Sequence, residues 1–126
     1  MKVLVDASVV LAVYLAEPGS ETAALHLHEA AISVVNLSEV YRKLVDSGVA
    51  IADAVQTIAA FRLDPIPFDE QQCIEAARLR PLTRHIGASL ADRACLGLAL
   101  LNGFAVLTAD RKWDLLDLPI DIRQIR

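Results

Sequence analysis

The chain has 126 residues, of which 55% are hydrophobic and 22% charged, so its composition fits one packed globular domain and excludes a disordered protein. The formal net charge of −4 argues against a protein that holds duplex nucleic acid by charge alone. RNA is not excluded, because bound divalent metals reverse the local field. No apolar run reaches the ~18 residues that a membrane span requires, and the N-terminal stretch lacks a convincing cleavage site. We therefore expect a single domain over residues 1–126 in a cytoplasmic protein.

Short β-branched runs alternate with longer helical patterns, which is typical of βαβ units and of an α/β fold with a mostly parallel sheet. The expected strands are residues 2–6, 31–35, 65–67, 104–108 and 120–124. The expected helices lie near residues 8–16, 20–29, 37–47, 51–62, 69–82 and 89–102. Gly48 and Gly103 follow two of these helices, where a left-handed backbone commonly ends a helix.

Several residues refine the positions of these elements. Pro65 and Pro67 restrict the third strand to an edge of the sheet or to a strand start, because proline cannot donate to a strand ladder. The last strand alternates in polarity and also looks like an edge strand. The helix 89–102 is apolar nearly all round, so we expect it to be buried on more than one side. Cys73 and Cys95 lie in separate helical patterns, and we expect two reduced, mostly buried thiols.

Four acidic residues follow the ends of separate apolar, strand-like runs. Asp6 closes VLVD, Glu39 follows ISVVNLS, Asp92 follows IGASLA, and Asp110 closes FAVLTAD. In an open α/β sheet, ligands and metals bind in the crevice outside the carboxyl ends of the strands. The first, second and fourth strands would be neighbours in a doubly wound sheet, and the buried helix would present Asp92 from its first turn. The sequence therefore predicts one acidic pocket built by the four side chains.

Helix and turn capping is the competing explanation for each acid taken alone. Asn36 precedes Glu39 by three residues, and Ser89 precedes Asp92 by three, which is the spacing of an N-cap and its acidic partner. Asp6 is placed to cap the first helix, and the fourth acid is placed to open a turn. Capping predicts no common location for these side chains, however, so their joint placement at strand ends favours the pocket.

A cluster of carboxylates needs a compensating cation. Carboxylates within ~5 Å of one another repel and raise each other's pKa. One or two Mg²⁺ or Mn²⁺ ions relieve this repulsion, prefer oxygen ligands and complete their shells with water. Such a water can attack a phosphodiester, so no serine, cysteine or histidine nucleophile is needed. We expect Asp6 and Asp92 to be the firmest metal ligands. Glu39 and Asp110 would bind directly or through water, and the identity of the general base stays open.

Small polar and basic residues lie near the acids in the sequence. Three of them could support a carboxylate, a metal-bound water or a phosphate, with capping as an equal alternative: Ser8, Asn36 and Thr108. Three arginines could form a rim that contacts phosphate, although a solvated helix face is the ordinary explanation: Arg84, Arg93 and Arg111. These six residues are the candidates for supporting and substrate-binding roles.

At this point the sequence resembles a PIN-domain ribonuclease, specifically the VapC toxin of bacterial toxin–antitoxin pairs. The similar segments are VLVDASVVLAVYLAEPGSE, ISVVNLSEVYRKL, PFDE, PLTRHIGASLADRACLGLAL and VLTADRKW, which together span nearly the whole chain. The four acidic positions of the family pattern are filled here by Asp6, Glu39, Asp92 and Asp110. The resemblance therefore implies an intact set of site residues.

The resemblance also implies a fold, an activity and partners. It implies a compact three-layer α/β/α sandwich around a five-stranded parallel sheet. It implies cleavage of single-stranded or looped RNA, often transfer RNA, with Mg²⁺ or Mn²⁺. It further implies a homodimer and a small VapB-type antitoxin whose C-terminal tail blocks the pocket. Apolar positions on the first three helices could accept such a tail, although ordinary core is the alternative: Leu11, Tyr14, Leu15, Leu25, Tyr41 and Leu44.

Other classes with acidic pockets fit less well. A receiver domain would show adjacent acids after the first strand and a lysine after the last strand. An aspartyl phosphatase would need a second aspartate at the position of Ser8. The stronger alternative is a catalytically quiet module of the same fold that binds RNA or a protein partner.

Overall fold

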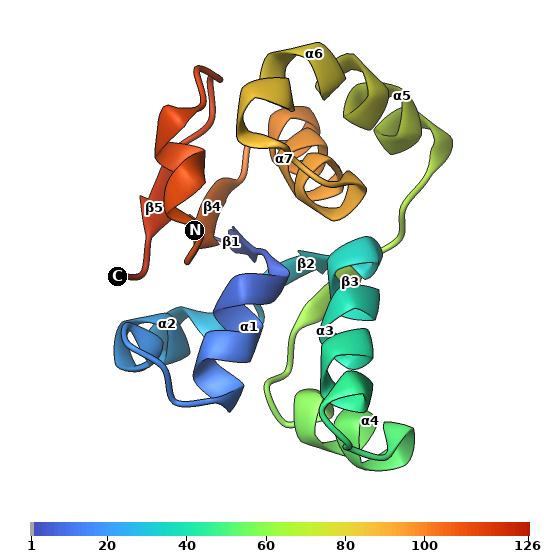
Figure 1. Ribbon diagram of the computed structural model, residues 1–126, viewed down its shortest axis with the longest axis vertical. Coiled ribbons are helices and arrows are strands. Elements are labelled where there is room, and N and C mark those ends of the chain that lie inside the picture. The colour runs from blue at the N-terminus through green and yellow to red at the C-terminus, as the bar shows by residue number, and fades with distance from the viewer. Residues whose placement is uncertain (1) are drawn as a thin grey trace.

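The computed structural model describes residues 2–126 and contains a five-stranded sheet in which all paired strands run parallel (Figure 1). The strands are β1 (Val3–Val5), β2 (Ala31–Ser33), β3 (Asp64–Ile66), β4 (Ala105–Thr108) and β5 (Ile122–Gln124). Their order is β3-β2-β1-β4-β5, which makes β2, β1 and β4 neighbours, as predicted. The proline-containing β3 and the alternating β5 are the two edge strands, which confirms both expectations.

Seven α-helices and two 3-10 helices connect these strands within residues 2–126. They are α1 (Ala7–Tyr14), α2 (Ser20–Leu27), α3 (Val34–Asp46), α4 (Ile51–Ala59), α5 (Glu70–Arg78), α6 (Arg80–Thr83), η1 (Arg84–Ile86), α7 (Leu90–Asn102) and η2 (Arg111–Leu115). Gly48 and Gly103 have φ angles of +97° and +69° after α3 and α7, so both take the predicted left-handed conformation.

The boundary between β2 and α3 differs from the prediction. The strand expected over 31–35 ends at Ser33, whose hydroxyl oxygen accepts a hydrogen bond from Val35 N at 3.2 Å and caps the helix. The helix begins at Val34, so the β-branched Val34-Val35 pair belongs to its first turn. Asn36 consequently lies inside the helix, and its predicted role as the N-cap is wrong.

Three further expectations need correction. The helix expected over 69–82 is divided into α5 and α6 close to Pro81, because proline has no amide hydrogen to continue a helix. Cys73 is exposed and only Cys95 is buried, although the expectation of two free thiols is confirmed. Leu90, at the start of the apolar helix, is 51% exposed, while the middle of α7 is buried as predicted.

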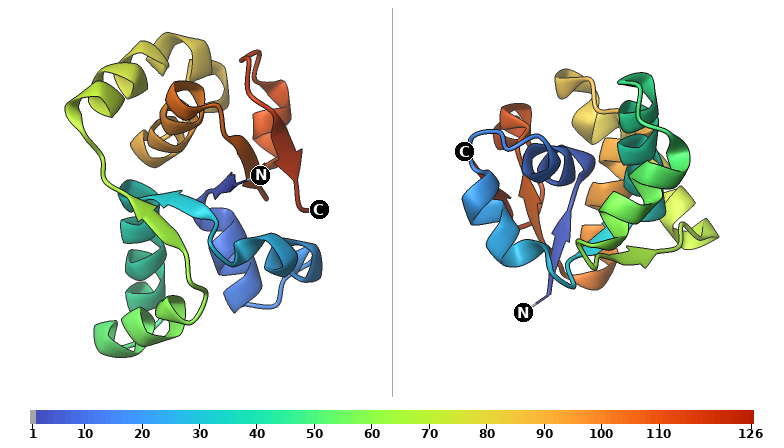
Figure 2. Two further views of the ribbon diagram at one scale, coloured as in Figure 1. Left: turned by 180° about the vertical axis from the view of Figure 1, so that it is seen from behind. Right: turned by 90° about the horizontal axis from the view of Figure 1, so that it is seen from below.

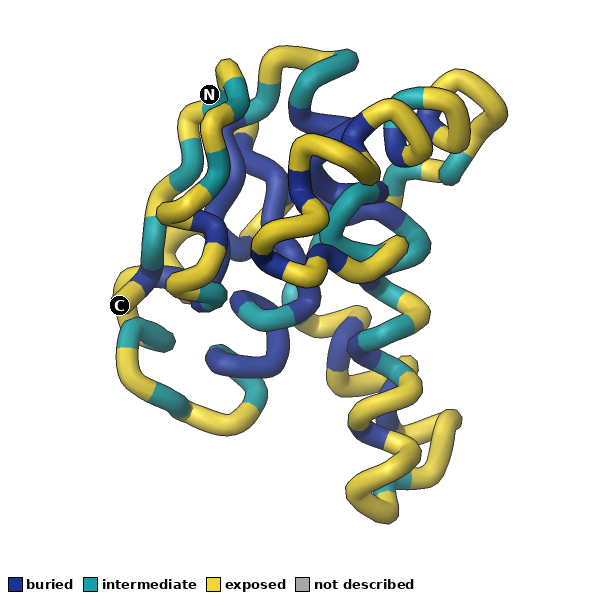
Figure 3. The backbone as a smooth tube through the Cα atoms, turned by 45° about the horizontal axis from the view of Figure 1, so that its top comes forward, coloured by how far each residue is buried: buried dark blue, intermediate teal, exposed yellow. Residues whose placement is uncertain are grey.

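Helices cover both faces of the sheet and form a three-layer α/β/α sandwich (Figures 1 and 2). Successive strand residues point to opposite faces. Val3 and Val5 of β1 therefore pack with α1, α2, α3 and α4, whereas Leu4 packs with α7 and with Trp113 of η2. Figure 3 shows the buried backbone concentrated around the central strands. The predicted architecture is confirmed, and no helix among residues 2–126 is long and apolar enough to cross a membrane.

Candidate active site

Asp6 is the most enclosed of the four acids, at the junction between β1 and α1. It is 4% exposed and caps α1 by accepting a hydrogen bond from Val9 N at 3.2 Å. The same oxygen, Oδ1, accepts from Ser8 Oγ at 2.5 Å, and Oδ2 accepts from Thr108 Oγ1 at 2.7 Å. Thr108 ends β4, which is the parallel neighbour of β1. Three donors from two chain segments therefore hold this carboxylate in one orientation.

The two hydroxyl groups also accept hydrogen bonds from the backbone that follows β4. Ser8 Oγ accepts from Ala109 N at 2.9 Å, and Thr108 Oγ1 accepts from Asp110 N at 3.0 Å. Each hydroxyl can donate to Asp6 while it accepts from an amide, since a hydroxyl carries one donor and two acceptor sites. Ser8 and Thr108 thus support the Asp6 carboxylate and position the segment that contains Asp110.

Asp92 occupies the first turn of α7 in a capping box with Ser89. Asp92 Oδ2 accepts from Ser89 N at 2.9 Å, and Ser89 Oγ accepts from Asp92 N at 3.1 Å. The side chain is partly buried. The capping role predicted from the sequence is therefore real, and it fixes the carboxylate at the helix end that faces the other acids.

Glu39 and Asp110 occupy more open positions. Glu39 lies in the second turn of α3, and its Oε1 is 3.4 Å from Lys43 Nζ one turn later. Asp110 caps η2 by accepting a hydrogen bond from Lys112 N at 2.9 Å. Both carboxylates are partly buried. They are less constrained than Asp6 and can adjust to a ligand.

The pKa values show that the acids influence one another. Burial is the largest cause that raises the pKa of Asp6 from 3.8 to about 6, and the negative charge of Asp92 adds to it. Burial also raises the pKa of Asp92, with the charges of Asp110 and Glu39 as further causes. Hydrogen bonds at both carboxylates oppose these effects only in part. The ends of β1 and β4, the second turn of α3 and the first turn of α7 therefore bring the four acids into one electrostatic cluster around Asp92.

This cluster suits a divalent ion that retains part of its water shell. Among residues 2–126, no three His, Cys, Asp or Glu side chains are close enough to hold a metal ion as they stand. Mg²⁺ typically takes one or two carboxylates directly and keeps several waters, so it does not require three preformed ligands. Within the same residues, no basic side chain forms an ion pair with Asp6, Asp92 or Asp110. The all-oxygen donor set and the uncompensated charge fit Mg²⁺ or Mn²⁺.

Asn36 joins the helices that carry the two most buried acids. It is 1% exposed, and its Oδ1 accepts from Ala7 N at 3.3 Å while its Nδ2 donates to Ala91 O at 3.1 Å. Ala7 follows Asp6 in the chain and Ala91 precedes Asp92. Asn36 therefore links the backbone on either side of the cluster instead of binding a carboxylate.

The three candidate arginines do not point together into the site. Arg93 donates from Nη1 to Ala76 O on α5 at 3.0 Å, and Arg111 donates from Nη1 to the Arg126 carbonyl at 2.9 Å. Arg84 lies exposed in η1. Sequence reasoning missed Arg42, which lines a hollow beside Glu39. Helical spacing offered a signal, because a residue three positions after Glu39 lies on the same face of α3.

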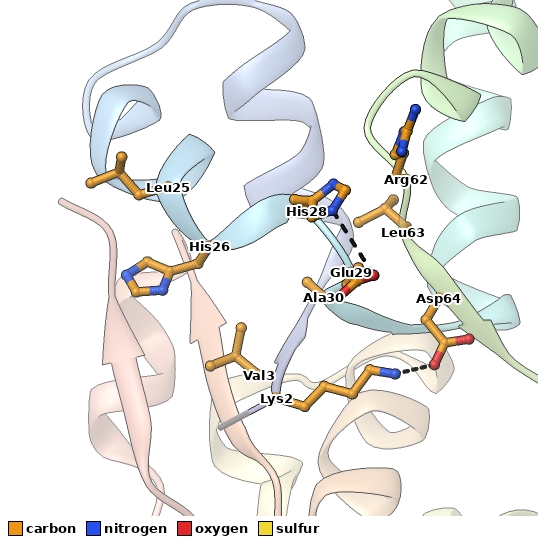
Figure 4. A pocket seen from close by; sticks show the side chains of 10 residues that line it. All are labelled: Lys2, Val3, Leu25, His26, His28, Glu29, Ala30, Arg62, Leu63 and Asp64. Atoms are coloured by element: carbon orange, nitrogen blue, oxygen red, sulfur yellow. Dashed lines mark hydrogen bonds and ion pairs between the residues drawn. The ribbon is translucent and has the colours of Figure 1, made fainter.

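Two hollows differ in their relation to the acids. The larger, of about 770 Å³, lies at the amino ends of β1, β2 and β3 and contains none of the four acids (Figure 4). Lys2 pairs with Asp64 in this hollow, and His28 Nε2 lies 3.9 Å from Glu29 Oε1. A smaller hollow, of about 360 Å³, lies between α3 and the start of α7 and includes Glu39. The smaller hollow is therefore the one that adjoins the acidic cluster.

Comparison with known proteins agrees with this architecture. A chain in a toxin–antitoxin complex from Klebsiella pneumoniae superposes with a TM-score of 0.77 at 16% identity, covering 99% of this chain and 98% of that chain. DNA-bound VapBC from Salmonella typhimurium gives 0.75 at 20% identity, with 100% and 99% coverage. VapBC2 from Rickettsia felis, bound to a promoter DNA fragment, gives 0.73 at 18% identity, with 98% of both chains covered. These likenesses show a shared fold.

Among the curated proteins none matches the chain. The family model described as PIN domain matches residues 3–118, which include all four acids and every strand except β5. The chain belongs to the PIN domain family.

Proposed function

We propose that this protein is a VapC-type endoribonuclease that hydrolyses RNA phosphodiester bonds with a water activated by Mg²⁺ or Mn²⁺. The observation that carries the proposal is the Asp6 carboxylate, which is 4% exposed, lies near the charge of Asp92, and has no basic partner among the described residues. Burial and the charge of Asp92 raise the pKa of Asp6, and a bound cation would relieve this cost of ionising the carboxyl group. Membership of the PIN domain family supports nuclease chemistry at this site.

The residues of the chain have distinct roles in this reaction. Asp6 and Asp92 would hold the metal, and Glu39 and Asp110 would bind it directly or through water. A bound divalent ion supplies an activated water and stabilises charge on the phosphate in the transition state. Ser8 and Thr108 keep Asp6 fixed through the hydrogen bonds described above, so that little reorganisation is needed when substrate binds.

The biological setting is part of the same proposal. A VapB-type antitoxin, a homodimer and transfer RNA as one candidate substrate follow from the VapC resemblance. The single domain over residues 1–126 and the cytoplasmic location follow from the length and composition of the chain. The similar structures are toxin–antitoxin and VapBC complexes, which supports the antitoxin. Of the apolar positions considered for an antitoxin tail, Leu15 and Leu25 are 57% and 82% exposed, whereas Leu11 and Leu44 belong to the core.

The test is cleavage of total small RNA by the purified chain with Mg²⁺, with Mn²⁺ or with chelator. Asp6→Asn is the site variant, and Asp53→Asn, at an exposed position in the first turn of α4, is the matched control. We expect discrete metal-dependent products from the wild type and the control, and none from Asp6→Asn. A folded, antitoxin-free wild type that cleaves nothing would instead favour the catalytically quiet module that binds RNA or a protein partner.

A further inference from the structure

A shallow hollow of about 360 Å³ separates the first two turns of α3 from the amino end of α7. Its lining comprises Val35, Ser38, Glu39, Arg42, Ser89, Leu90 and Ala91. Glu39 belongs both to this hollow and to the acidic cluster. Ser89 forms the opposite wall, and its amide donates to Asp92 Oδ2 at 2.9 Å. The hollow is therefore continuous with the site where the phosphodiester would react.

We propose that this hollow binds the nucleotide adjacent to the scissile phosphate. The inference rests on the proposed ribonuclease function and adds a substrate subsite to it. A chain of single-stranded RNA that places one phosphate at Asp6 and Asp92 must pass its next nucleotide over a neighbouring surface. The gap between α3 and α7 provides that surface on the side of Glu39.

One wall of the hollow is apolar and suits the face of a base. Val35 and Ala91 are partly buried, and Leu90 is 51% exposed at the first residue of α7. An exposed leucine beside a charged cluster gains contact area when a base covers it. No aromatic side chain lines this hollow among the described residues, so it lacks a stacking platform. The aliphatic wall makes no directional contact, so it does not distinguish one base from another.

Arg42 supplies the positive charge that a nucleotide phosphate requires. It is the basic residue in the lining, and its Nη1 lies 3.0 Å from Asp46 Oδ2 within α3. Both side chains are more than half exposed, at 60% and 65%, so this pair is weak and readily exchanged. An arginine fork matches two phosphate oxygens and can leave Asp46 for them. Arg42 would also offset the repulsion between RNA and the acids beyond Glu39.

Two serine hydroxyls complete the polar side of the hollow. Ser89 Oγ accepts from Asp92 N at 3.1 Å and retains its proton as a donor. Ser38 is exposed one residue before Glu39. Both hydroxyls can exchange hydrogen bonds with a ribose 2′-hydroxyl or a base edge, which are the groups read in single-stranded RNA.

The test compares two hollow variants with two matched surface variants of the full chain. Arg42→Ala is paired with Arg78→Ala, because Arg78 is also an exposed helix residue whose partner, Glu75, lies one turn away. Leu90→Ser is paired with Leu82→Ser, because Leu82 is a helical leucine of matching exposure, 52%, that does not line the hollow. Unfolding temperatures establish that all four variants fold. The probe is a short fluorescein-labelled single-stranded RNA of mixed sequence, measured for cleavage with Mg²⁺ and for binding with Ca²⁺.

We expect Arg42→Ala and Leu90→Ser each to raise KM and to weaken RNA binding by about 3- to 10-fold, with kcat nearly unchanged. The slope of log affinity against log salt concentration should decrease by about 1, the value of one phosphate contact, in Arg42→Ala alone. Cleavage that is equal in all four variants would overturn the subsite and leave the nuclease intact. Absent cleavage with binding lost only in the two hollow variants would overturn the nuclease and support the nucleotide site. A wild type that neither cleaves nor binds the RNA would overturn both the nuclease and the nucleotide site.

Discussion

The amino ends of the strands form one edge of the sheet and the carboxyl ends form the other, and the charges at these two edges are arranged differently. At the amino edge, the larger hollow contains acidic and basic groups that pair with each other, as Lys2 does with Asp64 (Figure 4). At the carboxyl edge, the buried Asp6 and the partly buried Asp92 lie beside like charge, and burial raises the pKa of both. Under the proposed function, the chemistry lies beside the smaller hollow, so the size of a hollow does not locate it. Uncompensated charge that the fold holds in place is the better indicator.

The largest expected effect is the loss of cleavage when an acid of the carboxyl edge is neutralised. Asp92→Asn keeps the shape of the side chain but removes the charge that helps to hold the metal, so we expect at least ~100-fold lower kcat/KM. Asp64→Asn at the amino edge should change kcat/KM by less than about 2-fold, because its carboxylate pairs with Lys2 and lies away from the acids. Single-turnover cleavage of one RNA by both variants measures the contrast.

Equal losses in Asp92→Asn and Asp64→Asn would contradict the distinction between the edges. An isothermal titration with Mn²⁺ provides a second readout. We expect Asp64→Asn to bind the ion like the wild type and Asp92→Asn to bind it at least ~10-fold more weakly, in the range that altered metal sites show.

A second prediction concerns stability in the presence of chelator. The pKa of Asp6 is about 6 in the folded protein and 3.8 ordinarily, so between these values the folded state retains a proton that the unfolded state has released. Stability must therefore fall as pH rises from about 4 to about 6, and above that range the penalty is complete. A pKa difference of this size corresponds to roughly 3 kcal/mol.

Asp6→Asn removes that penalty because the amide carries no charge. With chelator at pH 8, we expect the variant to be more stable than the wild type by roughly 1–3 kcal/mol, and the difference should shrink toward pH 4. Urea unfolding at several pH values measures it. Added Mg²⁺ should then stabilise the wild type but not the variant. A difference that does not depend on pH would show that the Asp6 charge is not the cause.

Much of this site could be predicted from the sequence because parallel strands deliver their carboxyl ends to one edge. Asp6, Glu39 and Asp110 each follow a strand, and the order β2-β1-β4 places those strands side by side. The capping spacing between Ser89 and Asp92 likewise identified a helix start. These features depend on residue patterns within single elements and on which strands are neighbours. Both can be inferred from spacing along the sequence.

The remaining features depend on how helices approach one another. The hydrogen bonds of Asn36 to Ala7 N and Ala91 O arise only where α1, α3 and α7 meet. Arg93 follows Asp92 directly, yet its guanidinium turns toward α5 because a helix places consecutive residues about 100° apart. The β-branched pair after Ser33 was predicted as strand because β-branched side chains favour strands. The Ser33 cap instead places this pair in the first turn of α3.

A third prediction concerns the hydrogen bonds through which Thr108 positions Asp6 and Asp110. Thr108→Val keeps the side-chain shape but removes the donor to Asp6 and the acceptor for Asp110 N, and Thr108 is fully buried. Leaving these partners unsatisfied should lower stability by about 1–3 kcal/mol. Thr108→Ser restores the hydroxyl and should recover most of the activity lost in Thr108→Val. Chemical unfolding together with kcat measures both, and similar kcat values for the valine and serine variants would argue against a positioning role.

The smallest effect should come from the amino edge. Lys2→Met removes the ion pair with Asp64, but both side chains are more than 40% exposed, so water and salt already screen the charges. We expect less than about 1 kcal/mol of change in unfolding free energy and an unaltered rate of RNA cleavage. Because the larger hollow loses the Lys2–Asp64 ion pair in this variant, unchanged cleavage would separate that hollow from catalysis. A fall in kcat as large as that of Thr108→Val would instead require the two edges to be coupled through β1, the strand that lies between Lys2 and Asp6.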